Sequence, residues 1–292
     1  IKAGRGAELV AALWDAKADK PDGVLSGDEV LEGGDTPVEW GVSWPWEYIT
    51  NMTYGMRPHE MVAYGAGTGV GKTDILKRVV GHIIKEHGQK VGVLLLEEPN
   101  LMLTMDTIAG QIDGQFYHVP DRDYDKEQKD KTKALLGKHL EMYKVGGGVD
   151  ADEILGVIRY MVVGLGCAHI FLDHVTYILD GCASEDQNAA MKNLMRALND
   201  LNKELPFTLH YVSHLRKAKA GGKSHEEGGR VSLDDFVGGK AVTQYANFAF
   251  GLERDQQADD PEEGDITTLR GLKDRYTGQL VGKTLALKYN HT

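Results

Sequence analysis

The stretch MVAYGAGTGVGKTDILKRVV, residues 61–80, sets an apolar segment and a helical run on either side of a glycine-rich loop. Five small residues lead up to a Lys-Thr pair: Gly65, Ala66, Gly67, Gly69 and Gly71. Glycine usually weakens regular structure, because it loses the most conformational freedom on folding. Glycines clustered between a strand and a helix therefore indicate backbone that wraps closely around a bound group, and a phosphate chain is the obvious candidate.

Eight consecutive residues fit the phosphate-binding pattern GxxxxGK[ST], with alanine in place of the first glycine: Ala66, Gly67, Thr68, Gly69, Val70, Gly71, Lys72 and Thr73. Small side chains let the amide N–H groups point inward at phosphate oxygens, and the following helix adds its positive N-terminal end. We expect Lys72 to reach the β- and γ-phosphates and the Thr73 hydroxyl to ligate Mg²⁺. A chance glycine-rich turn is the alternative, but the context of strand, loop and helix favours a nucleotide site.

Apolar segments alternate with helical patterns around this loop. We predict strands over residues 61–64, 91–96, 168–172, 207–213, 248–252, 266–271 and 283–289, and helices over 73–86, 150–165 and 185–205. Residues 121–138 are very polar and predict a solvated helix or a surface excursion. Strands that alternate with helices predict an α/β fold with a mostly parallel central sheet flanked by helices.

The N-terminal segment has a different composition. Leu9, Leu13 and Trp14 fall at helical spacing and predict a short amphipathic helix over residues 6–17. Residues 18–37 are rich in Gly, Asp and Pro and are typical of a linker. We therefore expect an N-terminal helix and linker over residues 1–40 and one α/β domain over residues 41–292. Packing of the short helix on a neighbouring copy and packing on its own chain both stay open.

Composition excludes several classes of protein. The chain has 292 residues, 41% of them hydrophobic, and a net charge of −11. That charge argues against a wholly basic nucleic-acid coat, although it leaves room for local basic loops. No apolar run approaches the ~20 residues that cross a bilayer, and no signal peptide is visible, so we expect a cytoplasmic protein without a membrane partner. Cys167 and Cys182 show no spacing typical of zinc or disulfides, which agrees with a reducing compartment.

Polar residues follow three of the predicted strands. Glu97 and Glu98 come after VGVLLL, Asp173 ends the apolar run of HIFLDH, and His214 ends LHYVSH. The carboxyl ends of parallel strands are where ligands bind in such sheets. There Asp173 could hold a Mg²⁺-bound water, Glu97 could deprotonate a water that attacks a γ-phosphate, and His214 could sense that phosphate. Taken alone, each has a plainer interpretation: a capping Asp, a solvated Glu98, a structural His.

Together with the P-loop, these strand ends resemble those of RecA-like motor ATPases, which have a P-loop NTPase core. The stretches VGVLLLEE, IFLDHVTYI, HEEG, GLERDQQ and LKDRYTG resemble one branch, the DnaB-like hexameric replicative DNA helicases. Within it, the chain is similar to the helicase half of phage primase-helicases and of Twinkle, from about residue 55 to residue 290. The resemblance implies a helicase that couples Mg-dependent NTP hydrolysis at subunit interfaces to translocation on single-stranded DNA and to duplex unwinding.

The resemblance also implies roles for individual residues at the phosphate end of the nucleotide. Lys72 and Thr73 match the P-loop pair, and Glu97 matches the catalytic base. Asp173 matches the acid that orders Mg²⁺, and His214 matches the phosphate-sensing histidine.

Five further residues match positions beyond that core. Gln244 matches a glutamine placed between the γ-phosphate and the DNA loops, and Tyr289 matches an aromatic residue that packs against the bound base. Three basic residues match positive groups associated with the nucleotide of an adjacent subunit, and we take the last as the arginine finger: Arg254, Lys273 and Arg275. The alternative for each arginine is a surface ion pair.

A basic, glycine-containing loop follows the His214 strand and carries Arg216, Lys217, Lys219 and Lys223. Contacts of such loops to a phosphate backbone are largely independent of sequence and sensitive to salt. The family implies that the loop lines a central channel around single-stranded DNA, whereas a solvated charged loop is the alternative. The chain departs from the family pattern nearby, since Thr243 and Val237 stand where relatives often carry basic residues.

These similarities imply a set of cofactors and partners. They are ATP, or dTTP or another NTP, with Mg²⁺; further copies of the chain in a hexameric ring, docked through residues 7–17; single-stranded DNA; and a primase domain or protein and a replicative DNA polymerase. The expected compartment is the host cytoplasm of a phage rather than the mitochondrial matrix. Two alternatives stay open: a RecA- or RadA-type recombinase that forms filaments, and a nucleotide-gated loader or scaffold that does not unwind DNA.

Overall fold

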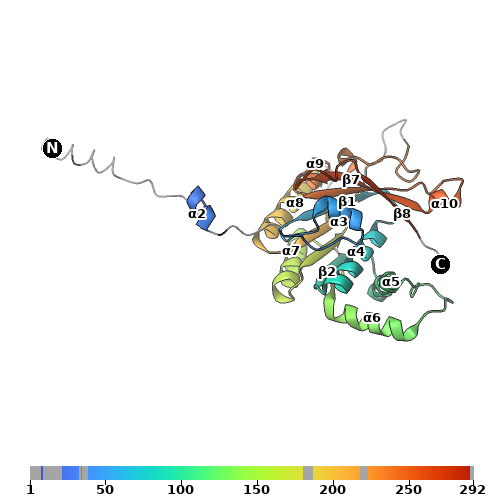
Figure 1. Cartoon of the computed structure of the whole chain (residues 1–292). Helices are drawn as coiled ribbons and strands as arrows, with labels where there is room; N and C mark the ends of the chain where they lie inside the picture. The colour runs from blue at the N-terminus through green and yellow to red at the C-terminus, as the bar shows by residue number, and fades with distance from the viewer. Residues whose placement is uncertain are drawn as a thin grey trace. The chain divides into compact units, whose positions relative to one another are not determined.

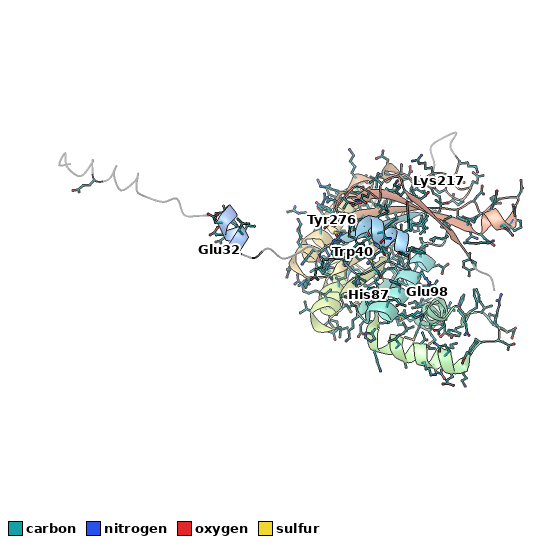
Figure 2. All side chains as sticks on the ribbon, in the orientation of Figure 1. Glu32, Trp40, His87, Glu98, Lys217 and Tyr276 are labelled. Carbon is teal, nitrogen blue, oxygen red and sulfur yellow. The ribbon has the colours of Figure 1, made fainter. Side chains whose placement is uncertain are left out.

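The computed structural model describes residues 8, 22–32, 34, 39–179, 187–217 and 223–289. The chain divides into two compact units, Ile1–Glu39 and Trp40–Thr292, and Figure 2 labels Trp40 at the start of the second. The helix predicted over residues 6–17 lies outside the described residues, apart from Glu8, which is helical and exposed.

The first unit contains a short exposed helix, α2 (Gly27–Glu32). We predicted a linker there, and for these residues the prediction is wrong. The Ser26 N–H donates to the Glu29 carboxylate (2.6 Å), and the Glu29 N–H donates to the Ser26 hydroxyl (3.2 Å). This reciprocal capping box satisfies two N–H groups at the start of a helix, and its S-x-x-E signature was legible in the sequence.

The second unit is built on an eight-stranded sheet with the order β3-β2-β4-β5-β1-β6-β7-β8 (Figure 1). The first six strands in this order run parallel, whereas β7 and β8 run antiparallel to their neighbours. The predicted mostly parallel α/β sheet is therefore confirmed. The strands are β1 (Met61–Ala66), β2 (Val91–Leu95), β3 (Leu140–Met142), β4 (His169–Asp173), β5 (Thr208–His214), β6 (Phe248–Glu253), β7 (Ile266–Asp274) and β8 (Thr284–Lys288). Of these, β3 was not predicted.

Helices cover both faces of the sheet (Figure 1). They are α3 (Glu47–Thr53), α4 (Lys72–His87), α5 (Leu101–Asp113), α6 (Lys126–His139), α7 (Ala151–Arg159), α8 (Gln187–Glu204), α9 (Lys240–Gln244) and α10 (Pro261–Gly264), with a π-helical turn, η1 (Tyr160–Gly164), continuing α7. The sequence predicted α4, α7 and α8, but not α5. None of the described helices combines the length and the apolar character that crossing a membrane requires.

The central strand β1 is buried at every position, because its side chains feed two cores in alternation. Val62 and Tyr64 pack in the core beneath α4 and α5, and Met61 and Ala63 pack in the core beneath α7 and α8. Burying one medium-sized apolar side chain stabilises the fold by roughly 1.5–3 kcal/mol. The loop that follows β1 therefore starts from a rigid base.

Two histidines lie inside the core beside β1. The His210 Nδ1 lies 3.1 Å from the Tyr64 hydroxyl, and the His210 Nε2 lies 3.4 Å from the His169 Nδ1. The Gln89 Oε1 lies 3.0 Å from the His169 Nε2. Burial lowers the pKa of His169 to about 3 and lowers the pKa of His210 well below its ordinary value. Both side chains are therefore neutral in the folded protein near pH 7.

We expect this pair to make the domain acid-sensitive. An unfolded histidine takes up its proton near pH 6.5, whereas the folded His169 resists protonation down to about pH 3. Between these values the unfolded chain binds more protons, so stability is complete above pH ~6.5 and falls by about 1.4 kcal/mol per pH unit for such a group as the pH drops. Thermal unfolding between pH 7 and pH 5 should show this loss, and His169→Gln should reduce its slope. An unchanged slope in that variant would contradict the assignment.

Candidate active site

The glycine-rich loop joins the end of β1 at Ala66 to the start of α4 at Lys72. Gly69 and Gly71 have φ angles of 73° and 97°, in the left-handed region that glycine adopts without a steric penalty. The loop consequently turns sharply into the N-terminus of α4. This is the strand, loop and helix arrangement that the P-loop pattern requires.

The predicted strand-end residues come together at one edge of the sheet. Strands β2, β4, β5 and β1 are consecutive neighbours and run parallel, so their carboxyl ends lie side by side. These ends carry Glu97, Asp173, His214 and the P-loop, respectively. The fold therefore assembles four elements that are far apart in the sequence.

Thr73 and Asp173 form one half of the cluster. The Thr73 hydroxyl donates to the Asp173 Oδ2 at 2.7 Å, while the Asp173 Oδ1 is buried without a hydrogen-bond partner among the described residues. Burial raises the pKa of Asp173, and the hydrogen bond from Thr73 acts against that rise. A hydroxyl beside a carboxylate with a spare oxygen is the kind of donor set that hard cations prefer.

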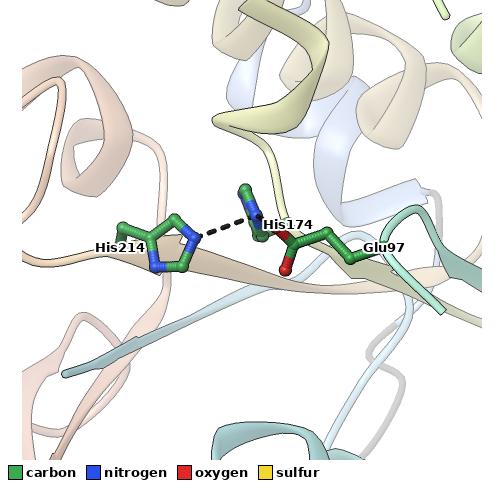
Figure 3. A group of neighbouring side chains, drawn as sticks. All are labelled: Glu97, His174 and His214. Atoms are coloured by element: carbon green, nitrogen blue, oxygen red, sulfur yellow. Dashed lines mark hydrogen bonds and ion pairs between the residues drawn. The ribbon is translucent and has the colours of Figure 1, made fainter. Parts of the chain in front are cut away.

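The other half is a chain of four side chains, three of which Figure 3 shows. The Lys72 Nζ lies 3.3 Å from the His214 Nδ1, the His214 Nε2 lies 2.9 Å from the His174 Nε2, and the His174 Nε2 lies 3.1 Å from the Glu97 Oε1. Sequence reasoning missed His174. Its only signal was its position next to Asp173 at a strand end.

The hydrogen-bond partners of His174 fix its tautomer. The Tyr177 N–H donates to the His174 Nδ1 at 3.1 Å, so the proton of the neutral ring resides on Nε2. That N–H points at the Glu97 carboxylate. Glu97, His174 and His214 have the composition of a metal site. A protonated Nε2, however, has no lone pair for a metal, so this arrangement acts as a hydrogen-bond chain.

The chain has more donors than acceptors. Burial, His174 and Lys72 lower the pKa of His214 to about 4, so its ring is neutral and carries one N–H. If that N–H is on Nε2 it faces the His174 N–H, and if it is on Nδ1 it faces the Lys72 ammonium. Either way two donors confront each other. An anionic oxygen between Lys72 and His214 would supply the missing acceptor.

Glu97 is suited to accept a proton. Its side chain is 57% exposed, so water reaches it. Partial burial alone would raise the pKa of Glu97, but the hydrogen bond from His174 and the proximity of Lys72 and His214 outweigh this and lower it. Glu98 (labelled in Figure 2) instead accepts the Asn100 N–H at 3.0 Å in a local turn.

A cavity of about 550 Å³ opens beside the P-loop. Val70 and Gly71 line it on one side, and Arg254 and Tyr289 line it on another. Its volume is in the range of small-molecule sites, which is about 300–1,000 Å³. The resemblance implied that Arg254 serves the nucleotide of an adjacent subunit. Here Arg254 lies beside the P-loop of its own chain, because it directly follows β6, the neighbour of β1.

Lys273 and Arg275 lie elsewhere, near the opposite edge of the sheet. Because β7 is antiparallel, Asp274 pairs with Phe248, the first residue of β6. The Lys273 ammonium donates to the backbone carbonyls of Thr243 (2.7 Å) and Gln244 (3.1 Å), and the Arg275 guanidinium donates to that of Gln244 (3.3 Å). The structure therefore does not bring these three predicted residues to the P-loop of their own chain.

Lys273 and Arg275 form a pair of like charges. Burial and the neighbouring Arg275 lower the pKa of Lys273 to about 8. Neither cation forms an ion pair with a carboxylate within residues 39–179, 187–217 and 223–289. An anion carried by another molecule would relieve this repulsion.

The basic loop is described only in part. Arg216 and Lys217 are exposed just beyond β5, and Figure 2 labels Lys217. Lys219 lies outside the described residues. Lys223 is exposed and forms an ion pair with Asp255, with 3.1 Å between the Lys223 Nζ and the Asp255 Oδ2.

Residues 41–289 match the family described as the DnaB-like helicase C-terminal domain. The chain belongs to this family. The predicted resemblance is thereby confirmed, and the family implies nucleotide binding.

Similar proteins agree with this assignment. The chain is 29% identical, over 312 residues of alignment, to the DNA helicase/primase of Enterobacteria phage T3, and the match covers 98% of this chain and 52% of that protein. The chain therefore spans about half the length of this relative. Its structure is similar to that of a helicase-type ATPase domain (TM-score 0.67, 18% identity, 97% and 94% of the two chains) and to that of a DnaB-like replicative helicase described with its interactions with primase (0.69, 20%, 98% and 69%). At these identities the two structures show a shared fold.

Proposed function

We propose that this domain is the motor of a replicative DNA helicase. It hydrolyses ATP, dTTP or another NTP at the interfaces of a homo-oligomeric ring of six copies, moves along single-stranded DNA and separates the duplex. One observation carries the proposal: the chain Lys72–His214–His174–Glu97 lacks one acceptor, at the position that a γ-phosphate oxygen would take.

Hydrolysis follows from the geometry at the sheet edge. Glu97 takes a proton from a water, the resulting hydroxide attacks the γ-phosphorus, and the bond to the leaving diphosphate breaks to give NDP and phosphate. Lys72 and His214 donate to the γ-phosphate oxygens. Thr73 and Asp173 fit Mg²⁺, which would neutralise charge on the phosphates when bound. The nucleoside occupies the cavity lined by Arg254 and Tyr289.

The remaining positive charge comes from a neighbouring copy. Arg275 and Lys273 lie far from their own P-loop and form no ion pair in the described part of the chain, which suits a role at the nucleotide of the next subunit. Such a head-to-tail contact closes into a ring when the rotation allows. We assign residues 7–17 to docking on that subunit, and residues 1–40 and 41–292 to linker and motor, respectively.

Partners follow from the same proposal. The basic residues Arg216, Lys217, Lys219 and Lys223 grip single-stranded DNA, with Gln244 between the nucleotide and the DNA loops. The phage relative is a helicase/primase, and one similar structure was described with primase, which supports a primase domain or protein as a partner. A replicative DNA polymerase would complete the replication fork.

A forked DNA substrate tests the proposal. We expect DNA-stimulated NTP hydrolysis together with displacement of one strand, and rings in electron micrographs with a non-hydrolysable analogue. Filaments with strand exchange would support a recombinase instead. Hydrolysis without displacement would support a loader or scaffold.

His174 gives a sharper test of the hydrogen-bond chain. We expect His174→Ala to slow hydrolysis about 10²-fold, the usual effect of a small misplacement of a catalytic group, while nucleotide affinity changes little. His174→Gln keeps an N–H for Glu97 and should recover part of the rate. If both variants lost nucleotide affinity in parallel with turnover, His174 would be a structural residue and not a positioning residue.

A further inference from the structure

A short turn, residues 224–229 with the sequence SHEEGG, lies against the P-loop and has no part in the chemistry above. The Ser224 hydroxyl donates to the Glu227 carboxylate at 2.9 Å, and the Gly229 N–H donates to the Ser224 carbonyl at 2.8 Å. A Cβ on Gly229 would lie only 2.3 Å from the Lys223 carbonyl oxygen, so the turn requires glycine there. The turn is therefore compact and locally pinned.

His225 seats this turn on the phosphate loop. A Cβ built on Gly67 would lie 3.0 Å from the His225 Cβ and 3.3 Å from the Glu226 Oε1. His225 is only 5% exposed, yet neither ring nitrogen has a hydrogen-bond partner among the described residues. Packing on the P-loop, rather than polar contacts of its own, therefore holds this histidine in place.

A second contact straps the same turn to the P-loop. The Gln256 side-chain amide donates to the Thr68 carbonyl at 2.8 Å, and the Gln256 N–H donates to the Glu226 carbonyl at 3.0 Å. Glu227 forms a β-bridge with Asp255, and Asp255 forms the ion pair with Lys223. The turn and residues 255–256 thus form one body, which touches the P-loop at one end and the basic segment at the other.

We propose that this body links the basic segment to the P-loop mechanically, with His225 and Gln256 as positioning residues. The inference rests on the proposed function, because it takes the basic residues to bind single-stranded DNA. Lys223 is bonded directly to Ser224, so DNA that draws Lys223 away from Asp255 also shifts the turn against Gly67. By linkage, DNA then changes nucleotide affinity by the factor by which nucleotide changes DNA affinity.

The test measures that factor on the full chain. The probes are a non-hydrolysable ATP analogue and a labelled oligothymidylate, each titrated with and without saturating amounts of the other. We expect His225→Ala and Gln256→Ala to keep each separate affinity within about twofold of the parent and to reduce the coupling factor about fivefold or more, since couplings are typically 5–150-fold. The matched control is His139→Ala on α6, which also removes a ring nitrogen that lacks a described partner and should leave coupling intact.

The outcomes separate the two proposals. Parent-like coupling in both variants would overturn the link. Loss of nucleotide affinity without DNA would also overturn it, because His225 would then belong to the binding site itself. If the parent chain bound no oligonucleotide, the proposed function would fail instead.

Discussion

Glu97→Gln should bind nucleotide as tightly as the parent chain and hydrolyse it about 10²–10⁴-fold more slowly, the usual contribution of a general base. The amide has nearly the same shape as the carboxylate but cannot accept the proton of the attacking water. Because the Glu97 carboxylate contacts His174 and not the P-loop, its replacement leaves the phosphate contacts in place. Phosphate release in a single turnover, alongside titration with a non-hydrolysable analogue, separates the two effects.

Glu98→Gln is the matched control, since it makes the same chemical change at the adjacent residue. Glu98 accepts the Asn100 N–H in a turn and contacts none of the four residues of the hydrogen-bond chain in the described structure. We expect it to retain most of the activity. Full DNA-stimulated turnover by Glu97→Gln would show that Glu97 is not the base.

Arg275→Ala should lower turnover about 10³–10⁵-fold, the range found for arginine fingers that stabilise charge on the transferred phosphoryl group. It should also poison parent rings when the two are mixed, because each mutant copy disables the site of its neighbour. The reason is positional: Arg275 lies near the sheet edge opposite the P-loop, where its guanidinium donates to the backbone carbonyl of Gln244.

Arg159→Ala controls for the loss of a surface arginine. Arg159 forms an ion pair with Glu204 (2.6 Å) on the α7 side of the fold, and its removal should change turnover little. If mixtures of Arg275→Ala with the parent chain lost activity only in proportion to dilution, the arginine would not act on another copy.

Sequence reasoning located the active site because its parts follow from strand direction. Glu97, Asp173 and His214 each follow an apolar run, and parallel strands must deliver their ends to one edge. His174 could not be recognised in this way. Its tautomer, and hence its role, depends on the Tyr177 N–H and on two side chains from other strands.

The missed elements have weak local signals. Strand β3 has three residues at the edge of the sheet and is fixed by its pairing with β2, which a short sequence cannot reveal. Helix α5 begins after Asn100, whose side chain accepts the Leu103 N–H at 3.0 Å, a capping contact that the sequence does permit.

The positions of Arg254 and Arg275 show a further limit of sequence. Both arginines follow strand-like runs, and the resemblance gave them one shared role. The antiparallel direction of β7 places them at different edges: Arg254 beside its own P-loop and Arg275 away from it. Pairing direction is a tertiary property that composition and periodicity do not encode.

The most direct test of the account mixes two inactive variants. Glu97→Gln retains the arginine and lacks the base, whereas Arg275→Ala retains the base and lacks the arginine. If one copy completes the site of the next, random mixing at equal amounts should restore hydrolysis, with about a quarter of the head-to-tail interfaces carrying both groups. Nucleotide turnover that rises clearly above that of either variant alone is the result we predict. Turnover in the mixture no higher than the average of the two variants would contradict a site shared between subunits.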